Sequence, residues 1–284
     1  MKITTIIAGE SSSIPLELAQ KHEIKLVPFV MDWEEGSMYE GENIFEKMRN
    51  GKKQGMKTFP KTSQPSIGVY KKAFDEVLKQ GQEIVCITIS SKISGTYNSA
   101  FQAKKMLNEE DQKKVFIYDT LNADATEALV AIKFAELAQA GESAEKIYNS
   151  LDLSKIHLFG MVESPRWLEA GGRISPTIAG LLEKMQGIGM RPVLGLKDGL
   201  IKPTTLKMQA KDTAEALLKE LKGLKNPKLR ISITHGDNLE EALKLKSLIE
   251  KDLPESKIEF INFISTVIGA HTGPGTLIAC AIEE

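Results

Sequence analysis

The regular alternation of strand and helix patterns constrains the fold of this chain most strongly. Short apolar runs rich in β-branched residues, such as Ile3 to Ala8 and Glu83 to Ile89, are typical of buried strands. Helical patterns lie between such runs, as in Pro15 to Lys21 with a proline at its start and Ser66 to Gln80 with a glycine at its end. This alternation predicts an α/β fold built mainly on parallel sheet.

Length and a change of pattern predict two domains. With 284 residues the chain exceeds the commonest size of a single core. Residues 1–155 are expected to form an N-terminal doubly wound, mainly parallel α/β domain, in which Met31 to Gly55 is a surface excursion with a short helix near Ile44 to Met48. Residues 156–284 are expected to form a C-terminal mixed-sheet α/β domain, because Asp198-Gly199 is a strong two-residue hairpin signal.

Composition limits the partners and the location. The net charge of −1 provides no general attraction to nucleic acid or to an anionic membrane. The apolar run at the N-terminus is too short for a secretory signal, and no apolar stretch is long enough to span a bilayer. Cys86 and Cys280 lie inside strand-like runs and are expected to be buried thiols, so a cytoplasmic location is predicted.

Two hydroxyl-rich loops precede helices of the first domain. Ser94-Gly95-Thr96 follows the strand Glu83 to Ile89, at a place where α/β sheets bind ligands and where a helix start offers free N–H groups. Thr62-Ser63-Gln64-Pro65-Ser66 precedes the next helix in the same manner. Each loop has a structural alternative, in which Ser94 or Ser66 only caps its helix. If the loops converge, they form one anion site.

The third polar segment contains His271. Two glycines and a proline follow it in Thr272-Gly273-Pro274-Gly275, which predicts a tight turn that lets backbone approach a ligand. A structural role for this histidine is the alternative. The other histidines have no ligand-like spacing with each other or with the cysteines, so no metal site is predicted.

Five motifs occur in an order that resembles the DegV family over nearly the whole chain. They are Thr62 to Ser66, Ile89 to Tyr97, Gly171-Gly172-Arg173-Ile174-Ser175, Lys197-Asp198-Gly199 and His271 to Gly275. This family consists of bacterial fatty-acid-binding proteins that serve as the acyl-binding subunit of fatty acid kinase. The resemblance implies a non-catalytic protein that holds one long-chain fatty acid in an apolar tunnel between two domains and needs no cofactor.

The resemblance also implies a role for individual residues. Ser63 and Ser94 would donate hydroxyl hydrogen bonds to the carboxylate, Gly95 a backbone N–H, and His271 a ring N–H or a positive charge. Thr62 and Thr272 would support them. A fatty acid kinase would be the protein partner, with transient membrane contact for ligand exchange, and Arg173 is expected to contact that partner near the pocket mouth.

Parts of the chain depart from the family pattern, and rival functions stay open. The loop at Gly9-Glu10 and the segment Leu121-Asn122-Ala123-Asp124 differ from the usual residues around the pocket wall. A phosphosugar or phosphotransfer enzyme would also use Ser/Thr loops at helix starts, with Lys92 as the nearby cation. A serine hydrolase using Ser94 and His271 would need a third triad member, which the sequence does not identify.

Overall fold

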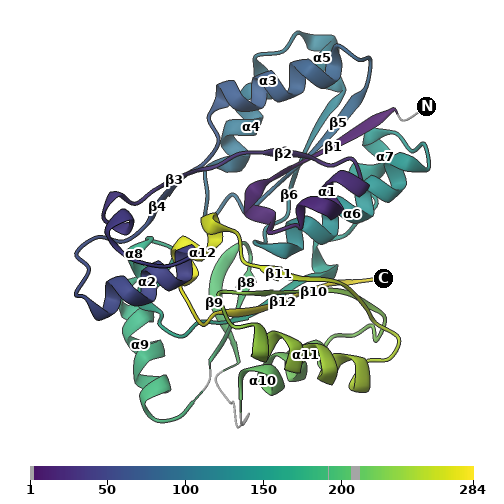
Figure 1. Ribbon diagram of the computed structural model, residues 1–284. Coiled ribbons are helices and arrows are strands. Elements are labelled where there is room, and N and C mark those ends of the chain that lie inside the picture. Colours follow the sequence, from purple (N-terminus) through teal and green to yellow (C-terminus); the bar gives the residue numbers. More distant parts are fainter. Residues whose placement is uncertain (1–2, 191, 206–211) are drawn as a thin grey trace.

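The structure, a computed structural model, describes residues 3–190, 192–205 and 212–284 (Figure 1). The strands are β1 (Thr4–Gly9), β2 (Lys25–Val27), β3 (Val30–Asp32), β4 (Lys61–Ser63), β5 (Glu83–Thr88), β6 (Val115–Asp119), β7 (Ile156–Met161), β8 (Val193–Lys197), β9 (Leu200–Thr205), β10 (Leu229–His235), β11 (Lys257–Phe263) and β12 (Leu277–Glu283). The α-helices are α1 (Leu16–Lys21), α2 (Ile44–Lys53), α3 (Ile67–Leu78), α4 (Thr96–Lys105), α5 (Glu109–Lys113), α6 (Ala125–Gln139), α7 (Ala144–Tyr148), α8 (Arg166–Ala170), α9 (Pro176–Gly187), α10 (Thr213–Lys222), α11 (Leu239–Asp252) and α12 (Thr266–Thr272). Short 3-10 turns are η1 (Glu10–Ser12), η2 (Glu34–Met38) and η3 (Leu153–Lys155).

Two large sheets carry the fold. The first has the order β2-β1-β5-β6, and its strands pair in parallel. The second has the order β11-β10-β12-β7-β8-β9. It is mixed, because β10 and β11 run parallel whereas its other neighbours run antiparallel. The prediction of one parallel and one mixed α/β sheet is confirmed.

The parallel sheet is covered on both faces. Ile7 and Cys86 pack in one core with residues of α3 and α4, while Ile6 and Val85 pack in another with residues of α6. Successive side chains of a strand point to opposite faces, so a strand buried on both sides needs a continuous apolar run. This need explains the runs that identified β1 and β5 in the sequence.

Helix α6 lies between the two sheets (Figure 1). It contacts β1 and β5 on one side and β10 and β12 on the other. Several of its buried positions are alanines, such as Ala128, Ala131 and Ala135, whose small side chains let both sheets come close. Because residues of both halves share this core, the domain boundary near residue 155 stays a prediction.

The excursion after β2 is more ordered than expected. Strands β3 and β4 pair antiparallel, so Thr62 and Ser63 lie on a strand rather than in a loop. Helix α2 extends from Ile44 to Lys53, capped by Asn43, and is longer than the helix predicted there. Arg49 on α2 forms an ion pair with Asp237, which joins the excursion to the end of β10.

The β8–β9 hairpin is the predicted two-residue turn. Asp198 and Gly199 both have positive φ, at 55° and 79°, as a type I′ turn requires. Its tip docks on the parallel sheet's side of the molecule, where Ser90 Oγ donates to Gly199 O at 2.8 Å.

The segment around His271 differs from the predicted turn. His271 lies in the last turn of α12, a helix capped by Ser265 and ended by Gly273 with φ of 78°. The turn signal in the sequence marked the end of this helix and not the position of the histidine. In the described part of the chain, no helix is long and apolar enough to cross a membrane.

Candidate functional site

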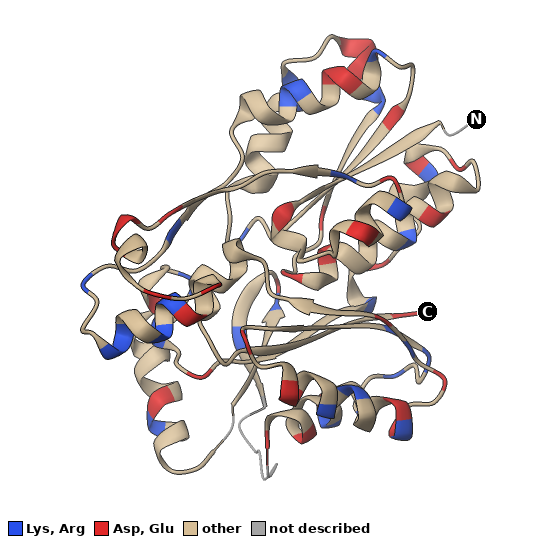
Figure 2. Ribbon diagram, in the orientation of Figure 1, with Lys and Arg blue, Asp and Glu red and all other residues tan. Residues whose placement is uncertain are grey.

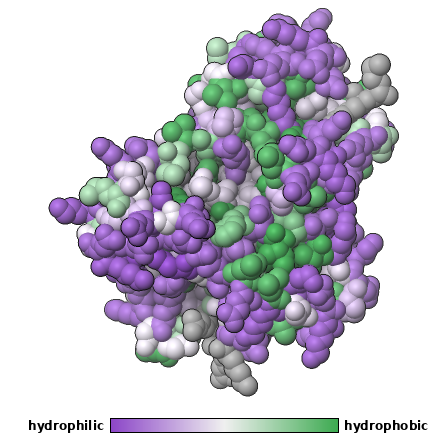
Figure 3. Space-filling model, in the orientation of Figure 1, coloured by the Kyte–Doolittle hydropathy of each residue, from purple (hydrophilic) through white to green (hydrophobic). Residues whose placement is uncertain are grey.

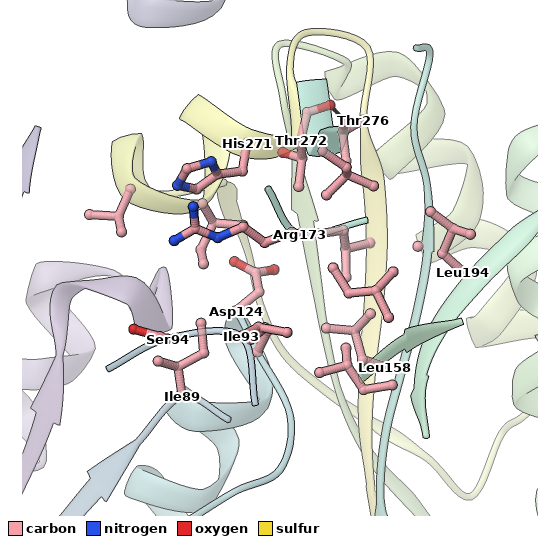
Figure 4. A pocket seen from close by; sticks show the side chains of 18 of the residues that line it. Ile89, Ile93, Ser94, Asp124, Leu158, Arg173, Leu194, His271, Thr272 and Thr276 are labelled. Atoms are coloured by element: carbon pink, nitrogen blue, oxygen red, sulfur yellow. Dashed lines mark hydrogen bonds between the residues drawn. The ribbon is translucent and has the colours of Figure 1, made fainter. Parts of the chain in front are cut away.

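One cavity combines an apolar interior with a cluster of polar groups (Figure 4). Its volume is about 100 Å³. Its apolar lining includes Leu158 and Gly160 on β7, Leu194 on β8 and Ile278 on β12. Its polar lining consists of Thr62, Gln64, Ser94, Asp124, Arg173, His271, Thr272 and Thr276. These eight residues come from segments far apart in the chain.

His271 and Thr62 form the centre of the polar group. His271 Nε2 lies 2.7 Å from Thr62 Oγ1, which joins α12 to β4. Among the described residues, His271 Nδ1 is buried without a hydrogen-bond partner. Gly171 is packed against this ring, and a side chain at position 171 would collide with Nδ1. A buried ring nitrogen without a partner is a candidate ligand contact.

The imidazole of His271 is neutral at pH 7. Burial lowers its pKa to about 4, and the nearby Arg173 adds to this effect by repelling a second positive charge. Of the two options that the resemblance left open, a neutral ring N–H donor therefore fits this environment better than an imidazolium. The positive charge of the site belongs to Arg173.

Arg173 lies in the cavity wall. Its guanidinium donates to Gly171 O, and burial lowers its pKa, although an arginine stays charged at neutral pH. Figure 4 shows the guanidinium directly beside the ring of His271. The sequence suggested a contact with a protein partner for this residue. Its position in the cavity wall places a positive charge beside the polar groups of the cavity.

Ser94 lines the cavity and also supports the start of α4. Its Oγ lies 2.8 Å from Thr96 Oγ1 and accepts from the N–H of Thr96 at 3.3 Å. Gly95 is the residue before α4, and its Cα lies so close to Gln64 that an added Cβ would be 2.6 Å from Nε2. Gly95 is the N-cap residue of α4 and, among the described residues, the helix has no side-chain cap, so Ser94 supports the helix start only through its local bonds to Thr96.

Ser63 is a correction to the predicted site. Its side chain is exposed and does not line the cavity, whereas Thr62 and Gln64 on either side of it do. The reason is the strand β4, in which consecutive side chains point to opposite faces. Ser66 takes the structural role that was its alternative, since it caps α3 by accepting from Val69 N.

The end of α12 supplies two more hydroxyl groups. Thr272 lines the cavity, and among the described residues its Oγ1 is buried without a partner. Thr276 also lines the cavity and was not predicted. Its hydroxyl bonds to Thr272 O and Gly273 O, both at 2.9 Å, and so fixes the turn after the helix.

Gln64 and Asp124 also line the cavity, and neither was predicted from the sequence as a site residue. Gln64 stood within a quoted motif and lies directly after β4, two residues from Thr62, so recognition of the strand would have suggested that it faces the same side as Thr62. Asp124 stood within the segment that departs from the family pattern, which was the only signal available for it. In the described part of the chain, no group of three or more His, Cys, Asp or Glu is placed to hold a metal ion. Cys86 and Cys280 are free and buried, as expected.

Comparison with known proteins identifies the family of this chain. The model of the DegV family, described as a family of uncharacterised proteins, matches residues 4–284. A fatty acid-binding protein of Thermotoga maritima is 29% identical, over 96% of this chain and 95% of its own length. A DegV domain-containing protein of Clostridium perfringens is 33% identical, over 82% of this chain and 79% of its own length.

A solved structure gives the same picture. The stearic acid-binding protein from Eubacterium ventriosum superposes with a TM-score of 0.80 and 26% identity, covering 99% of this chain and 98% of that one. The expected fold and the expected family are both confirmed. From end to end of the matched residues, this chain belongs to the DegV family.

Proposed function

We propose that this protein binds one long-chain fatty acid in the cavity, with the carboxylate at the polar corner and the tail along the apolar walls. The division of a single cavity carries the proposal: Thr62, Arg173 and His271 meet at one corner, and Leu, Ile, Val and Gly line most of the remainder. A fatty acid has the same division into a charged head and an apolar tail. The names of the Thermotoga maritima and Eubacterium ventriosum relatives support this class of ligand.

The tail supplies affinity and the head supplies orientation. At about 0.8 kcal/mol for each buried methylene, a tail of ~15 carbons contributes on the order of 12 kcal/mol before the costs of binding. Hydrogen bonds to a charged acceptor contribute roughly 1.5 to 3 kcal/mol each. Arg173, His271 Nδ1 and Thr272 Oγ1 are the groups best suited to receive the carboxylate, because the latter two are buried without partners among the described residues.

The cavity must widen to admit such a ligand. Its volume of about 100 Å³ is below the roughly 300 Å³ of the smallest ordinary ligand pockets. The β8–β9 hairpin contributes Leu194, Leu196 and Ile201 to the wall. We expect this hairpin to move outward when the ligand enters. The bond from Ser90 Oγ to Gly199 O, which attaches the hairpin tip to the opposite wall, opposes that movement.

A further part of the proposal concerns the partner. The protein presents the bound carboxylate to a fatty acid kinase, which forms the acyl phosphate, and it performs no chemistry itself. The five ordered motifs support this role, as does Arg173, which is half-buried and therefore accessible both to the ligand and to a docked protein. Lys, Arg, Asp and Glu are interspersed over the outer helices (Figure 2), in line with a small ligand rather than a nucleic acid.

Ligand exchange at a membrane surface belongs to the same proposal. Apolar residues gather across the middle of the face in Figure 3. Away from that region, helix α9 lies at the lower left of Figure 1. Leu181 on α9 and Ile188 just after it are 52% and 77% exposed, which would allow transient contact with lipid. The two free buried thiols fit a reducing cytoplasmic location.

The direct test is organic extraction of the purified protein followed by mass spectrometry. The expected result is a co-purified fatty acid in a nearly one-to-one molar amount. A protein that yields no lipid and also fails to bind added fatty acid would contradict the proposal.

The phosphosugar alternative is less well supported. A phosphosugar needs hydrogen bonds along its whole length, whereas the lining here is mainly apolar. Lys92, the cation that this alternative requires, is exposed and does not line the cavity. Turnover of a phosphosugar by the lipid-free chain would favour it nevertheless.

A further inference from the structure

Asp124 is a buried carboxyl group in the cavity wall, at the start of α6. Its exposed fraction is 0%. Its backbone has φ of 56° and ψ of −142°, a conformation that residues other than glycine rarely adopt. Neither the burial of a carboxyl group nor a strained backbone favours folding. Both persist where surrounding contacts hold them, and such positions cluster at functional sites.

Two hydroxyl groups from other elements hold this carboxyl group. Ser13, just after η1, donates to Oδ1, and Thr234 on β10 donates to Oδ2. Ser13 is itself in the left-handed region, with φ of 52°. The hydrogen bond between Ser13 and Asp124 thus joins two non-glycine residues that both have unfavourable backbone conformations.

Ser13 continues the connection to α12. Its Oγ accepts from the N–H of Ser265 at 2.8 Å, and its carbonyl accepts from Asn262 Nδ2 at 2.9 Å. Ser265 is the residue that caps α12. Because the Ser13 hydroxyl has one proton, donating it to Asp124 leaves the lone pairs of Oγ directed at Ser265. The carboxyl group therefore sets the direction in which Ser13 receives the start of α12.

Helix α12 is short, and His271 lies in its last turn. A rotation or shift at Ser265 is therefore transmitted over only seven residues to the imidazole and to its 2.7 Å contact with Thr62. Thr234 bonds to the same carboxyl group but is not hydrogen-bonded to α12, so it provides a natural comparison.

We propose that Asp124 is a positioning residue for the head-group corner: it orients Ser13, which holds the start of α12 and thereby aims His271 at the carboxylate. The inference rests on the proposed function for its effect on fatty acid binding. Its effect on His271 in the ligand-free protein does not depend on that function. Asp124 acts through Ser13 and need not touch the ligand.

The test compares Asp124→Asn, Ser13→Ala and the double variant with Thr234→Ala as the matched control. Binding is titrated with a fluorescent long-chain fatty acid. Asp124→Asn and Ser13→Ala are each expected to weaken binding about tenfold, the loss expected when one hydrogen bond of a charged group is removed. The double variant should be no weaker than either single variant, because both changes break one connection. Thr234→Ala should change binding less than about twofold.

A second measurement separates this inference from the proposed function. The NMR signals of the His271 ring in the ligand-free protein, assigned by their loss in His271→Asn, should shift in Asp124→Asn and Ser13→Ala and stay in place in Thr234→Ala. If no variant of the chain binds fatty acid but these signals shift as expected, the function fails and the positioning role stands. Additive losses in the double variant, an equal loss in Thr234→Ala, or unmoved His271 signals would overturn the positioning role.

Discussion

The two sheets contribute to the cavity in different ways, one through its strand ends and the other through its face. After β5 and β6 of the parallel sheet come Ile89, Ser94 and Asp124. The mixed sheet offers Leu158, Gly160 and Ile278 from neighbouring strands. Strand ends lead into helix starts and bring hydrogen-bonding groups, whereas a sheet face brings apolar side chains at every second position.

The mixed sheet adds polar groups only from segments that leave it. Arg173 lies between α8 and α9, and His271 lies on α12, which precedes β12. In the proposed binding mode, the apolar floor for the tail is therefore separate from the polar groups for the head. Because of this separation, single substitutions can change the tail site, the head-group site or the contact between the two sheets without changing the others.

The largest effect on fatty acid binding is expected when a side chain on the mixed sheet occupies the cavity space proposed for the tail. Gly160 lines the cavity, and an added Cβ would lie 3.3 Å from Ile278 Cγ1, so a long side chain there has to enter the space for the tail. Gly160→Leu should displace about five methylenes of the tail, which at ~0.8 kcal/mol each weakens binding about a thousandfold. Isothermal titration with a long-chain fatty acid measures the loss.

Gly180→Leu on α9 is the matched control, because no heavy atom lies within 4 Å of an added Cβ there. It should bind as the unchanged protein does. If Gly160→Leu binds equally well, the face of the mixed sheet is not the floor of the tail site.

The second prediction concerns Asp124, which follows β6, and the pH dependence of the free energy of unfolding that its ionisation causes. Burial raises the pKa of Asp124 to about 6, although its hydroxyl partners lower it. Between pH ~4 and ~6 the unfolded chain loses this proton while the folded chain keeps it, so stability falls as pH rises and the full loss is present above ~6. At 1.36 kcal/mol per pKa unit the loss is about 3 kcal/mol.

Urea unfolding of the native protein and of Asp124→Asn at pH 4.5 and 7.5 isolates this contribution. The stability advantage of the native protein over the variant should shrink by about 2 kcal/mol between pH 4.5 and pH 7.5, because about a third of the loss is already present at pH 4.5. Equal pH dependence in both proteins would mean that folding does not raise the pKa of Asp124.

A smaller effect is expected at the head-group corner. His271→Ala removes a donor to the carboxylate and should weaken fatty acid binding by about 2 kcal/mol, or roughly thirtyfold. Ser94→Ala should act in the same direction. Both variants should also stop acyl-phosphate formation by a cognate kinase, as measured with radiolabelled ATP.

Ser63→Ala is the control for this corner, since the exposed Ser63 faces away from the cavity that Thr62 enters. Its affinity should be unchanged. A loss in Ser63→Ala as large as that in His271→Ala would restore Ser63 to the head-group site.

The smallest effect is expected at the contact between the β8–β9 hairpin tip and the loop after β5, and it concerns the rate of ligand release. Ser90→Ala removes the hydrogen bond to Gly199 O and with it about 1 kcal/mol that keeps the hairpin tip in place. Release of the ligand, followed by stopped-flow fluorescence, should become about fivefold faster. Ser91→Ala, an exposed neighbour, should leave the release rate as it is.

Local sequence patterns predicted many of the helices and strands correctly. Asp198-Gly199 marked the hairpin correctly, because a two-residue turn with positive φ at both positions depends on the turn residues themselves. The strand β4 was missed, because three residues that include Lys61 and Ser63 have no apolar pattern and exist as a strand only through pairing with β3. The error at Ser63 followed directly from that omission.

By itself, the sequence determined the α/β class, the run of strands and helices, and which short polar motifs belong to the DegV family. These properties depend on residues close together in the chain, whose periodicity and turn chemistry act locally. Only the tertiary structure decided that Thr62, Arg173 and His271 meet, that Ser63 does not join them, and that Asp124 links to α12 through Ser13. Side-chain direction and contacts between distant segments arise from packing around the shared helix α6, and packing leaves no local trace in the sequence.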